Sequence, residues 1–454
     1  RDFCLSRGLG DVYKRQSFAS RPSTARLFET ALKNFSAPRG TFDILPADSR
    51  RWQALERLVD DVCVRFAYGE IRTPIFESTE VFVRTLGETT DVVDKEMYTF
   101  TDRGGRSLTL RPELTAPAVR AVLEHNLLQT PPVKLYYRGA FFRYERPQKG
   151  RYRQAHQFGI ECFGVEGPEA DAEVISLALE VITSAGIDDA SLEVNSMGCG
   201  LCRAAYRTAL VSFLDTRRGE LSETSRERLA HNPLRILDSK DPVDKALVAA
   251  GPKIGDFLCD ACREHFDGLL ALLDAMGISW KRNELVVRGF DYYTRTVFEF
   301  SSAALGAQNA ICGGGRYDGL VESMGGPPTP GVGFGMGMDR LLIVSQAASA
   351  TALGDTRRTL DVAFVALDAD ASRLLVPPMY ALRKRGFAAD MDYTRRAIKR
   401  QLSAAGETGA KFAAIVGEDE RVAGEATIQD LSTRERARVK LGELEAALAA
   451  RLRK

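Results

Sequence analysis

The chain has 454 residues, of which 44% are hydrophobic and 27% are charged, and its formal net charge is +1. A chain of this length is too long for one hydrophobic core of the usual size, so we expect two or three domains. Charged residues interrupt the apolar stretches, which excludes a membrane-spanning run of about eighteen apolar residues. The balanced charge means that any nucleic-acid partner must be held by local basic patches.

The N-terminal residues and the cysteines bear on the leader and on the cellular compartment of the protein. Residues 1–16 show no apolar periodicity, and we expect residues 1–36 to be a disordered or non-native leader; a transit peptide is the alternative for its Arg- and Ser-rich part. The eight cysteines form two close pairs and scattered single residues, unlike the dense framework of a secreted domain. We therefore predict a cytoplasmic protein.

The first predicted elements are a helix over residues 48–66, which follows an Asp cap, and a strand over residues 70–75. Pro74 lies inside that strand and lacks a backbone donor, so the strand belongs at a sheet edge or at a subunit contact.

The middle of the chain alternates between strands and helices. Charged helical sequence over residues 200–281 has the composition of an inserted module, and glycines gather at residues 313–315 and at every second position of residues 331–337. The other predicted elements are a strand over 107–113, a helix from Thr115, hairpin arms over 133–145 and 152–163, a helix over 171–185, strands over 191–195, 284–287 and 296–300, and a helix over 338–344.

The C-terminal part has a different pattern. After a linker rich in Ala, Ser and Thr, strands and helices alternate, which predicts a separate α/β domain with a largely parallel sheet. Its elements are expected at residues 361–367, 374–385, 388–393, 397–405 and 412–417.

The hairpin carries a charged face. Because strand side chains alternate, Phe141, Arg143 and Glu145 share one side of the first arm. Arg153, Gln157 and Glu161 share one side of the second arm, and the other face carries Phe142, Phe158, Ile160 and Cys162. A solvated sheet face would also be polar. This pattern alone therefore leaves open whether the charged face binds a ligand or only faces solvent.

Two arginines are suited to a phosphate ligand. Guanidinium groups form planar bidentate hydrogen bonds, and Arg143 and Arg340 fit that task. Arg340 lies in the first turn of the helix that follows the alternating glycines, where a flat ligand can approach the backbone. The glycines lack the G-x-G-x-x-G spacing of a dinucleotide site, and the absence of G-x-S-x-G disfavours a serine hydrolase.

Taken in order, these blocks resemble the three motifs of class II aminoacyl-tRNA synthetases: the helix and strand that end at Pro74, the FRYE sequence of residues 142–145, and the GMGMDR sequence of residues 335–340. Residues 109–113 (TLRPE) and 287–296 (VRGFDYYTRT) sharpen the resemblance to the histidyl-tRNA synthetase family, as does the turn from Glu145 to Arg153. The resemblance extends from about Ala37 to the C-terminus.

This resemblance implies an α+β catalytic domain built on an antiparallel sheet with flanking helices, a helical insertion and a C-terminal α/β domain. The predicted boundaries are 1–36 for the leader, 37–199 and 283–345 for the two parts of the catalytic domain, 200–282 for the insertion, 346–359 for the linker and 360–454 for an anticodon-binding domain.

The resemblance also implies a histidine pocket. Glu113 would meet the α-amino group of histidine, and Glu161 with Tyr292 or Tyr293 would hold the imidazole. Thr115 and Gln157 would complete the pocket. Both ring nitrogens need polar partners, because burying one unpaired costs about 1–3 kcal/mol.

The same resemblance assigns residues to ATP. Arg143 and Arg288 would bind the α-phosphate, with Arg288 as the main catalytic cation; the alternative for Arg288 is a structural ion pair with a carboxylate such as Asp291. The rest of ATP would contact Glu145 and Arg340, with Arg151 and Arg153 at the outer phosphates. Magnesium would accompany ATP.

Transfer RNA is the expected macromolecular partner. Arg146, Gln148 and Lys149 resemble the loop that touches the acceptor end of tRNA, although an exposed turn is polar in any case. A basic cluster at Arg395, Arg396, Lys399 and Arg400 is a candidate phosphate patch in the C-terminal domain. A homodimer is expected from the first motif.

Two positions depart from the family pattern. Ala155 stands where some members have an aromatic residue, and Leu114 where many have Gly. If that aromatic residue stacks on adenine, Phe158 or Arg340 would have to take over part of its role here.

Two C-x-x-C pairs, Cys199 with Cys202 and Cys259 with Cys262, lie at the start and in the later part of the predicted insertion; if they bracket the module, one ion would join its ends. Their spacing is that of a structural zinc site, although the sequence between them is long; His265 is an alternative ligand. Two disulfides or free buried thiols are the other interpretations.

The function implied is that of a histidine–tRNA ligase, which makes a histidyl-adenylate from ATP and L-histidine and passes histidine to tRNA. The alternative is a regulatory subunit of histidine biosynthesis that shares the catalytic fold without aminoacylation. Such a subunit would be expected to lack the C-terminal domain and parts of the VRGFDYYTRT sequence, and both are present here.

Overall fold

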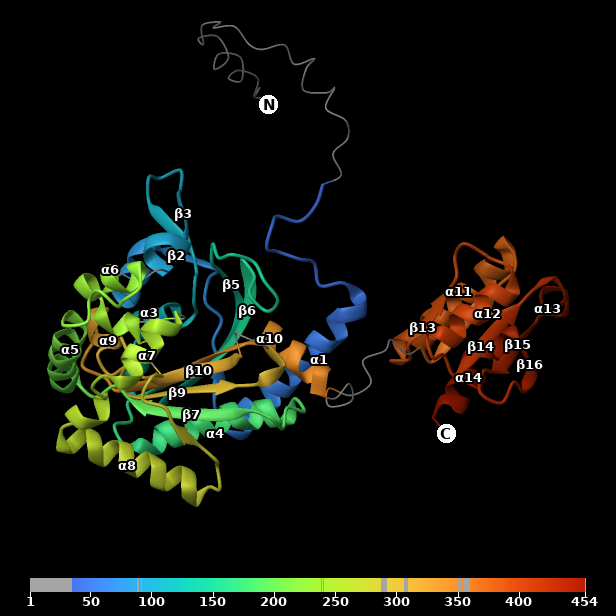
Figure 1. Cartoon of the computed structure of the whole chain (residues 1–454). Coiled ribbons are helices and arrows are strands. Elements are labelled where there is room, and N and C mark those ends of the chain that lie inside the picture. Colours follow the sequence, from blue (N-terminus) through green and yellow to red (C-terminus); the bar gives the residue numbers. More distant parts are fainter. Residues whose placement is uncertain are drawn as a thin grey trace, which may run out of the picture.

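The computed structural model describes residues 35–87, 90, 92–237, 239, 241–286, 292–305, 309–348, 353 and 360–453. The leader predicted for residues 1–36 lies almost wholly outside this part of the chain. Figure 1 shows one lobe built from residues 35–348 and a second built from residues 360–453. Among the described residues, every helix is too short or too polar to cross a membrane.

An eight-stranded sheet organises the first lobe, in the order β1-β5-β6-β11-β10-β9-β7-β8. Its six central strands are antiparallel, as predicted, and only the two edge strands β1 and β8 run parallel to their neighbours. The strands are β1 (Gly69–Glu70), β5 (Val133–Phe142), β6 (Gln154–Phe163), β7 (Ser191–Ser196), β8 (Lys281–Arg282), β9 (Thr294–Ser301), β10 (Ala310–Arg316) and β11 (Gly331–Gly337).

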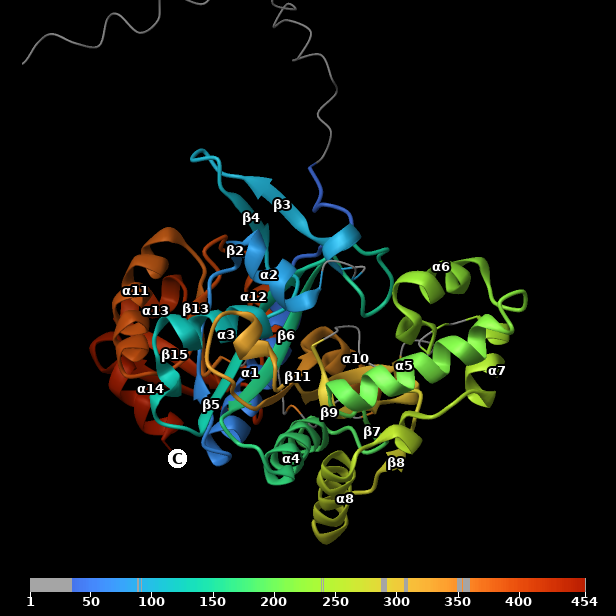
Figure 2. The ribbon, with the colours of Figure 1, turned by 90° about the vertical axis from the view of Figure 1, so that its left-hand side faces the viewer.

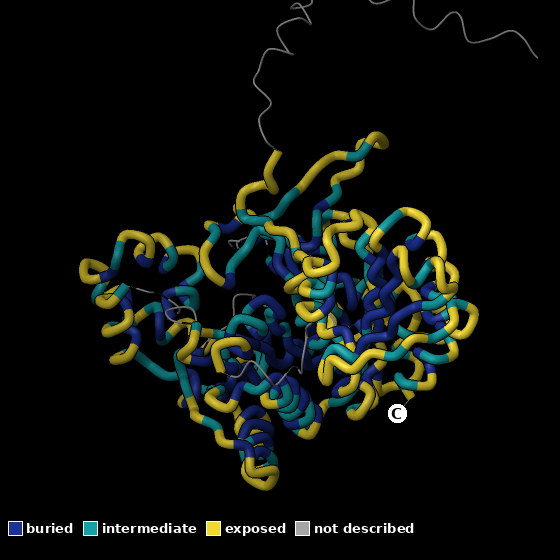
Figure 3. Tube along the Cα trace, turned by 90° about the vertical axis from the view of Figure 1, so that its right-hand side faces the viewer, coloured by how far each residue is buried: buried dark blue, intermediate teal, exposed yellow. Residues whose placement is uncertain are grey.

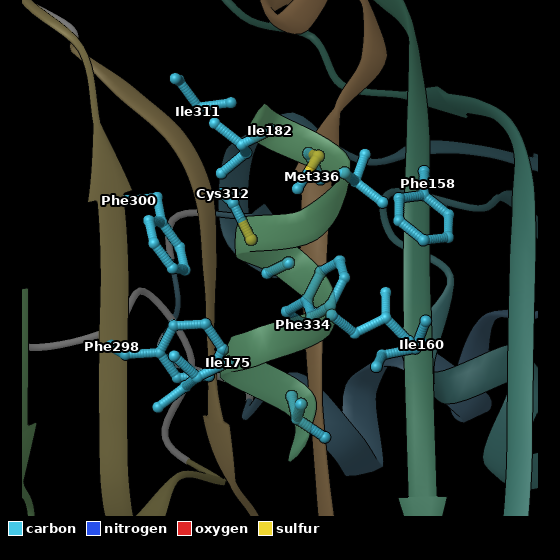
Figure 4. Packing of buried hydrophobic residues seen from close by; sticks show 14 of the residues in the cluster. Phe158, Ile160, Ile175, Ile182, Phe298, Phe300, Ile311, Cys312, Phe334 and Met336 are labelled. Atoms are coloured by element: carbon cyan, nitrogen blue, oxygen red, sulfur yellow. The ribbon is translucent and has the colours of Figure 1, made fainter. Parts of the chain in front are cut away.

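One face of this sheet is covered by helices. In Figure 4, Phe158 and Ile160 of β6 and Phe334 and Met336 of β11 point at α4 (Pro168–Ser184). This core also includes buried residues of α1 (Pro46–Arg65), α8 (Asp260–Ala275) and α10 (Met338–Ala348). Because strand side chains alternate, packing these apolar residues on α4 sends the intervening side chains to the opposite face.

A small antiparallel sheet stands beside the open face, in the order β2-β4-β3, and projects from the lobe in Figure 2. Its strands are β2 (Phe76–Ser78), β3 (Tyr98–Thr101) and β4 (Ser107–Leu110), and the elements around it are α2 (Thr79–Leu86), the π-helical turn Val92–Glu96, α3 (Thr115–Glu124), the 3-10 turns Leu127–Gln129 and Ala303–Leu305, and α9 (Leu320–Ser323). Arg111 joins this sheet to β5, because its guanidinium donates to the carbonyls of Thr73 and Ala140 at 3.0 and 2.8 Å.

The insertion between β7 and β8 is helical. Helices α5 (Gly200–Asp215), α6 (Glu223–His231) and α7 (Pro242–Ala250), with the 3-10 turns Pro233–Ile236 and Ile254–Phe257, enclose an apolar core of their own and lie together in Figure 2. Helix α8 differs, because its Phe266, Leu269 and Leu273 belong to the core of the main sheet. The insertion is therefore attached to the sheet through α8.

A buried charged cluster connects β10, α4 and α8. The Arg316 guanidinium of β10 is fully buried and donates to Asp171 of α4, whose carboxylate also lies 3.4 Å from His265 Nε2 of α8. These contacts hold the Asp171 pKa below its usual range despite burial. One strand and two helices are thus joined by polar contacts inside an otherwise apolar core.

The second lobe is a five-stranded sheet of order β13-β12-β14-β15-β16 with helices against it. The prediction of a largely parallel sheet is wrong for its second half, because β15 and β16 are antiparallel additions. The elements are β12 (Val362–Ala366), α11 (Ala369–Lys384), β13 (Ala389–Met391), α12 (Ile398–Glu407), β14 (Phe412–Val416), α13 (Glu418–Ala423), β15 (Glu425–Asp430), β16 (Arg436–Lys440), the 3-10 turn Leu441–Glu443 and α14 (Leu444–Leu452). In Figure 3, buried residues, drawn in dark blue, run through the interior of both lobes.

Several predicted elements are shorter than expected. Strand β1 ends at Glu70, well before Pro74, and β4 ends at Leu110, before Pro112. The helix predicted to follow an Asp cap begins instead at Pro46, whose fixed φ suits a first helical position.

The hairpin arms and the strand after the insertion also differ. Strand β5 ends at Phe142. The Arg143 amide still donates to the Arg153 carbonyl at 2.9 Å, but the Glu145 amide turns back to the Arg143 carbonyl at 2.8 Å. The strand expected over residues 284–287 is absent from the described residues 284–286, because Asn283 accepts the amide of Leu285 in a turn.

Candidate active site

A cavity of about 410 Å³ opens on the uncovered face of the main sheet. This volume is in the range of roughly 300–1,000 Å³ that is usual for small-molecule sites. Its walls come from β5, β6, β10 and β11, from the loop between β5 and β6, and from Arg235 of the insertion. Glycines are required here, because a Cβ at Gly335 would collide with the Gln157 amide and one at Gly333 with the Glu161 carboxyl group.

One end of the cavity is acidic and phenolic. Glu161 is 1% exposed and lies behind the wall, where its carboxyl oxygens accept the hydroxyl of Tyr137 at 2.7 Å and that of Tyr317. Burial raises the pKa of Glu161 to about 8. A carboxyl group with this pKa can hold or release a proton near neutral pH.

Glu113 is the second buried acid. It precedes α3 and accepts the amides of Thr115 and Ala116 at 2.6 and 2.8 Å. Burial raises its pKa, and these two hydrogen bonds oppose that shift. Thr115 Oγ1 lies 3.3 Å from the Tyr137 hydroxyl, so the two acids are connected through one polar network.

Two tyrosines form an aromatic wall next to these acids. The ring centroids of Tyr292 and Tyr293 are 4.7 Å apart, and the ring of Tyr317 lies edge-on to Tyr292 at 5.8 Å. Burial raises the pKa of Tyr292 well above its usual value. The Tyr292 phenol is therefore a neutral hydrogen-bonding group at physiological pH.

The other end of the cavity is cationic. Arg143 Nε donates to the Pro112 carbonyl at 2.7 Å, and its guanidinium lies 5.2 Å from the Phe141 ring. Arg340 is held by the carbonyls of Gly150 and Ala310, both at 2.8 Å. Burial and the charge of Arg151 lower the Arg340 pKa. Cations that repel one another in a desolvated site favour an anionic ligand.

A carboxylate lies among these cations. Glu145 is buried, pairs with Arg151, and has an oxygen 3.8 Å from Arg143 Nη1. The cavity thus has separate acidic and basic ends along one strand face.

Comparisons with known proteins agree with this geometry. A family model described as Histidyl-tRNA synthetase matches residues 40–341, and one described as Anticodon binding domain matches residues 378–451. A relative from Desulforudis audaxviator named Histidine--tRNA ligase is 48% identical over 90% of this chain and 97% of its own length. The chain belongs to the histidyl-tRNA synthetase family.

Two further relatives extend the comparison. A Histidine--tRNA ligase from Desulforamulus reducens is 46% identical over 91% of this chain and 99% of its own length. The crystal structure of apo S. aureus histidyl-tRNA synthetase is 36% identical, with a TM-score of 0.75, and covers 91% of this chain and 99% of that one. Both lobes of the chain are therefore part of the histidyl-tRNA synthetase architecture.

Most residues expected from the histidyl-tRNA synthetase resemblance are brought together by the fold. Those that line the cavity are Glu113, Thr115, Arg143, Glu145, Arg151, Gln157, Tyr292, Tyr293 and Arg340. Arg153 is placed outside the cavity wall, because its guanidinium stacks 3.8 Å from the Tyr144 ring. Arg288 and Asp291 lie outside the described residues, so neither interpretation of Arg288 is tested.

The residues expected at the tRNA acceptor end lie on the loop between β5 and β6. Arg146, Gln148 and Lys149 are all exposed there, and the loop closes through paired backbone hydrogen bonds between Gln148 and Arg151. A ligand larger than the cavity can reach these side chains.

Of the two residues expected to take over stacking on adenine, Phe158 is excluded, whereas Arg340 lines the cavity. Phe158 is fully buried on the core face of β6, where its ring meets Phe334 at 5.4 Å. On the cavity face, Ala155 is paired directly with Phe141 of β5, and both line the cavity. Alternation in β6 places residues 155 and 158 on opposite faces.

Four residues of the site were not identified in the sequence, and one of them is Glu96, the last residue of the π-helical turn. Tyr137 shares the face of Phe141 on β5, so extending the alternation by two steps would have found it. Tyr317 follows β10 and Arg235 lies in the insertion, and neither position carries a local signal for a site.

The four paired cysteines also come together. All four sulfur atoms lie within 4.8 Å of one another, and each cysteine is free. The alternative of two disulfides is therefore wrong for this structure. His265 is engaged with Asp171 instead of the cysteines.

The raised Glu161 pKa predicts a pH-dependent stability difference. The unfolded chain releases this proton near the ordinary value of 4.5, whereas the folded protein keeps it to about 8. The stabilisation is fully present below pH 4.5 and is lost as pH rises through about 8. In thermal unfolding without ligand, wild type should therefore lose stability relative to Glu161→Gln between about pH 5 and pH 9. The exposed Glu166→Gln control should show no such trend, and a constant difference for Glu161→Gln would contradict the assignment.

Proposed function

We propose that this chain is a histidine–tRNA ligase that converts ATP, L-histidine and tRNA(His) to histidyl-tRNA, AMP and diphosphate. The observation that carries the proposal is the cavity itself, which has buried acids and phenols at one end and clustered guanidinium groups at the other. Histidine is complementary to the acidic end, and a nucleoside triphosphate is complementary to the cationic end.

In this proposal the acidic end recognises histidine. Glu113 meets the α-amino group, Glu161 accepts an imidazole N–H, and Thr115 and Gln157 complete the pocket with Tyr292 or Tyr293. Each Glu161 oxygen has a second lone pair, so it can accept the imidazole and keep its phenol. Because Glu161 is behind the cavity wall, the neighbouring tyrosines have to move aside when histidine enters.

The cationic end binds ATP. The histidine carboxylate attacks the α-phosphorus in line, the bond to the diphosphate oxygen breaks, and histidyl-adenylate forms. Arg143, Gln157 and Arg288 position the reacting groups, and the two arginines stabilise the charge that develops on the α-phosphate. Glu145, Arg151 and Arg340 hold the rest of ATP, with Arg153 at the outer phosphates if its side chain leaves Tyr144.

Magnesium accompanies ATP in this proposal. Mg²⁺ prefers oxygen ligands and usually binds through one or two carboxylates together with substrate phosphates. Glu96 and Glu145 both line the cationic end and would supply such carboxylates. When bound, Mg²⁺ supplies positive charge to the diphosphate leaving group.

Transfer RNA is the second substrate. The 3′-terminal ribose hydroxyl attacks the carbonyl carbon of the adenylate, and AMP leaves. Arg146, Gln148 and Lys149 on the exposed loop contact the acceptor end. In the C-terminal lobe, Arg395, Arg396, Lys399 and Arg400 are exposed and would contact phosphates of the anticodon arm.

The regulatory-subunit alternative is not favoured. Relatives 46–48% identical along nearly their whole length are named ligases, and the second family model matches residues 378–451. A non-catalytic binding subunit would have no need for the cationic end of the cavity.

A homodimer forms part of the proposal. Ile75, Phe76 and Phe100 are 50%, 47% and 44% exposed on and beside the small sheet near Pro74. A second copy of the chain would cover this apolar surface, and light scattering of the purified protein should give twice the chain mass.

The activation step predicts histidine-dependent exchange of diphosphate into ATP. Of the amino acids tested singly, only histidine should support exchange. Arg143→Ala should lower the exchange kcat by about 100-fold or more, as loss of one transition-state donor does. Arg106→Ala, an exposed control in the same domain, should exchange normally. Exchange without an amino acid, or with another amino acid only, would defeat the proposal.

The acceptor loop predicts a separation of the two steps. A combined Arg146→Ala and Lys149→Ala variant should retain exchange, because neither side chain lines the cavity. Its transfer of histidine to tRNA should fall, with a raised KM for tRNA and a weaker dependence on salt. If both steps fell together, the loop would act in activation instead.

A further inference from the structure

The four paired cysteines occupy equivalent places on two helices. Cys199 and Cys259 are the residues that precede α5 and α8, and Cys202 and Cys262 lie in the first turns of those helices. The insertion thus leaves the sheet and returns to it through one cluster of sulfur atoms. Among the described residues, these four form a group with metal-ligand geometry.

The spacing of the sulfur atoms fits a tetrahedral ion. Four sulfurs at about 2.3 Å from one Zn²⁺ lie roughly 3.8 Å from each other. Here Cys199 Sγ and Cys202 Sγ are 3.6 Å apart, and all four sulfurs are within 4.8 Å. A disulfide would need a separation of about 2.05 Å.

Apolar packing does not account for the cluster. Cys202 and Cys262 are buried, but Cys199 is half-buried and Cys259 is exposed. Free cysteines that pack as small apolar residues are among the most buried side chains. An exposed cysteine whose sulfur lies within 4.8 Å of the sulfurs of two buried cysteines indicates a ligand instead.

Backbone groups are directed at the sulfur atoms. The Cys259 amide donates to Cys202 Sγ at 3.2 Å, and both helices, of 16 residues each, direct their positive ends at the sulfurs. Gly198, in the turn before α5, has φ +61°, a conformation that favours glycine. A Cβ at this position would also collide with Cys202 Cβ. The backbone is therefore shaped around these sulfur atoms.

The cluster is connected to the active site through one short segment. The Met197 amide donates to the Arg295 carbonyl at 2.6 Å, and the Arg295 amide donates to the Gly198 carbonyl at 2.9 Å. Arg295 is two residues from Tyr293, which lines the cavity, and the insertion between the cysteine pairs contributes Arg235 to the same wall. Whatever holds the cysteines together also limits the movement of these side chains.

We propose that Cys199, Cys202, Cys259 and Cys262 bind one structural Zn²⁺ as thiolates, releasing the thiol protons to solvent, and that the ion fixes the insertion and the Tyr292–Tyr293 segment to β7. Soft sulfur ligands in tetrahedral geometry select zinc over magnesium or calcium. The metal site stands on the sulfur geometry alone, and only its link to the cavity rests on the proposed function.

Metal analysis of the full chain, purified without chelators from zinc-supplemented cells, tests the site directly. We expect about one zinc per chain. Cys259→Ser, at the exposed position, should weaken zinc binding in competition with a chromophoric chelator by more than the roughly 10–100-fold that loss of an outer-shell partner costs. Cys63→Ala, which removes a buried cysteine of α1, should leave zinc content unchanged. Zinc-free wild type, iron in place of zinc, or full zinc content in a Cys202→Ser and Cys259→Ser double variant would overturn the proposal.

Hydrogen exchange tests the positioning role without using activity. Removing zinc from wild type should deprotect the amides of residues 199–203 and 292–296 and leave those of β12 and β14 unchanged. Unchanged protection at residues 292–296 would overturn the coupling. A zinc-bound chain that fails to exchange diphosphate would overturn the proposed function and leave the metal site intact.

Discussion

The active-site cavity depends on one constraint: the main antiparallel sheet directs its apolar side chains to one face and its polar side chains to the other. Phe158 and Ile160 of β6 pack against α4, so Gln157 and Glu161 of the same strand are directed to the opposite face. A shift of one residue in the register of β6 would bury the polar side chains and expose the apolar ones. The same packing that stabilises the core therefore sets which groups face the cavity.

The glycines of β11 leave space for a ligand on the cavity face of the sheet. Strand β11 pairs with β6 so that Gly333 lies opposite Glu161 and Gly337 opposite Gln157. A Cβ at Gly333 would occupy the space that Glu161 uses, and one at Gly335 would occupy the space that Gln157 uses. The apolar residues between the glycines, Phe334 and Met336, belong to the core. One strand thus supplies packing on one face and room on the other.

Burial then gives the two ends of the cavity opposite electrostatic character. At the acidic end, desolvation raises the pKa values of Glu113 and Glu161, and the phenols that bond to Glu161 stay neutral. At the basic end, desolvation lowers the pKa values of Arg151 and Arg340, which also lie near other cations. Backbone carbonyls already hold Arg143 and Arg340 in the ligand-free chain, so less binding energy is needed to order these two cations.

The sequence alone predicted the fold class and most of the candidate site residues, because the contiguous motifs that carry the family resemblance and the alternation of side chains along a strand are local properties of the chain. Glu113, Arg143 and Arg340 could be named in this way, and the fold brings all three to one cavity. Only the tertiary structure decided that Glu161 lies behind the wall, that Arg153 stacks on Tyr144, and that Tyr137 and Tyr317 hold Glu161. These facts depend on strand register and on contacts between residues far apart in the chain. The cysteine pairs illustrate both contributions: their spacing left a zinc site, two disulfides and free thiols open, and only the folding of the insertion brought the four sulfur atoms within 4.8 Å of one another.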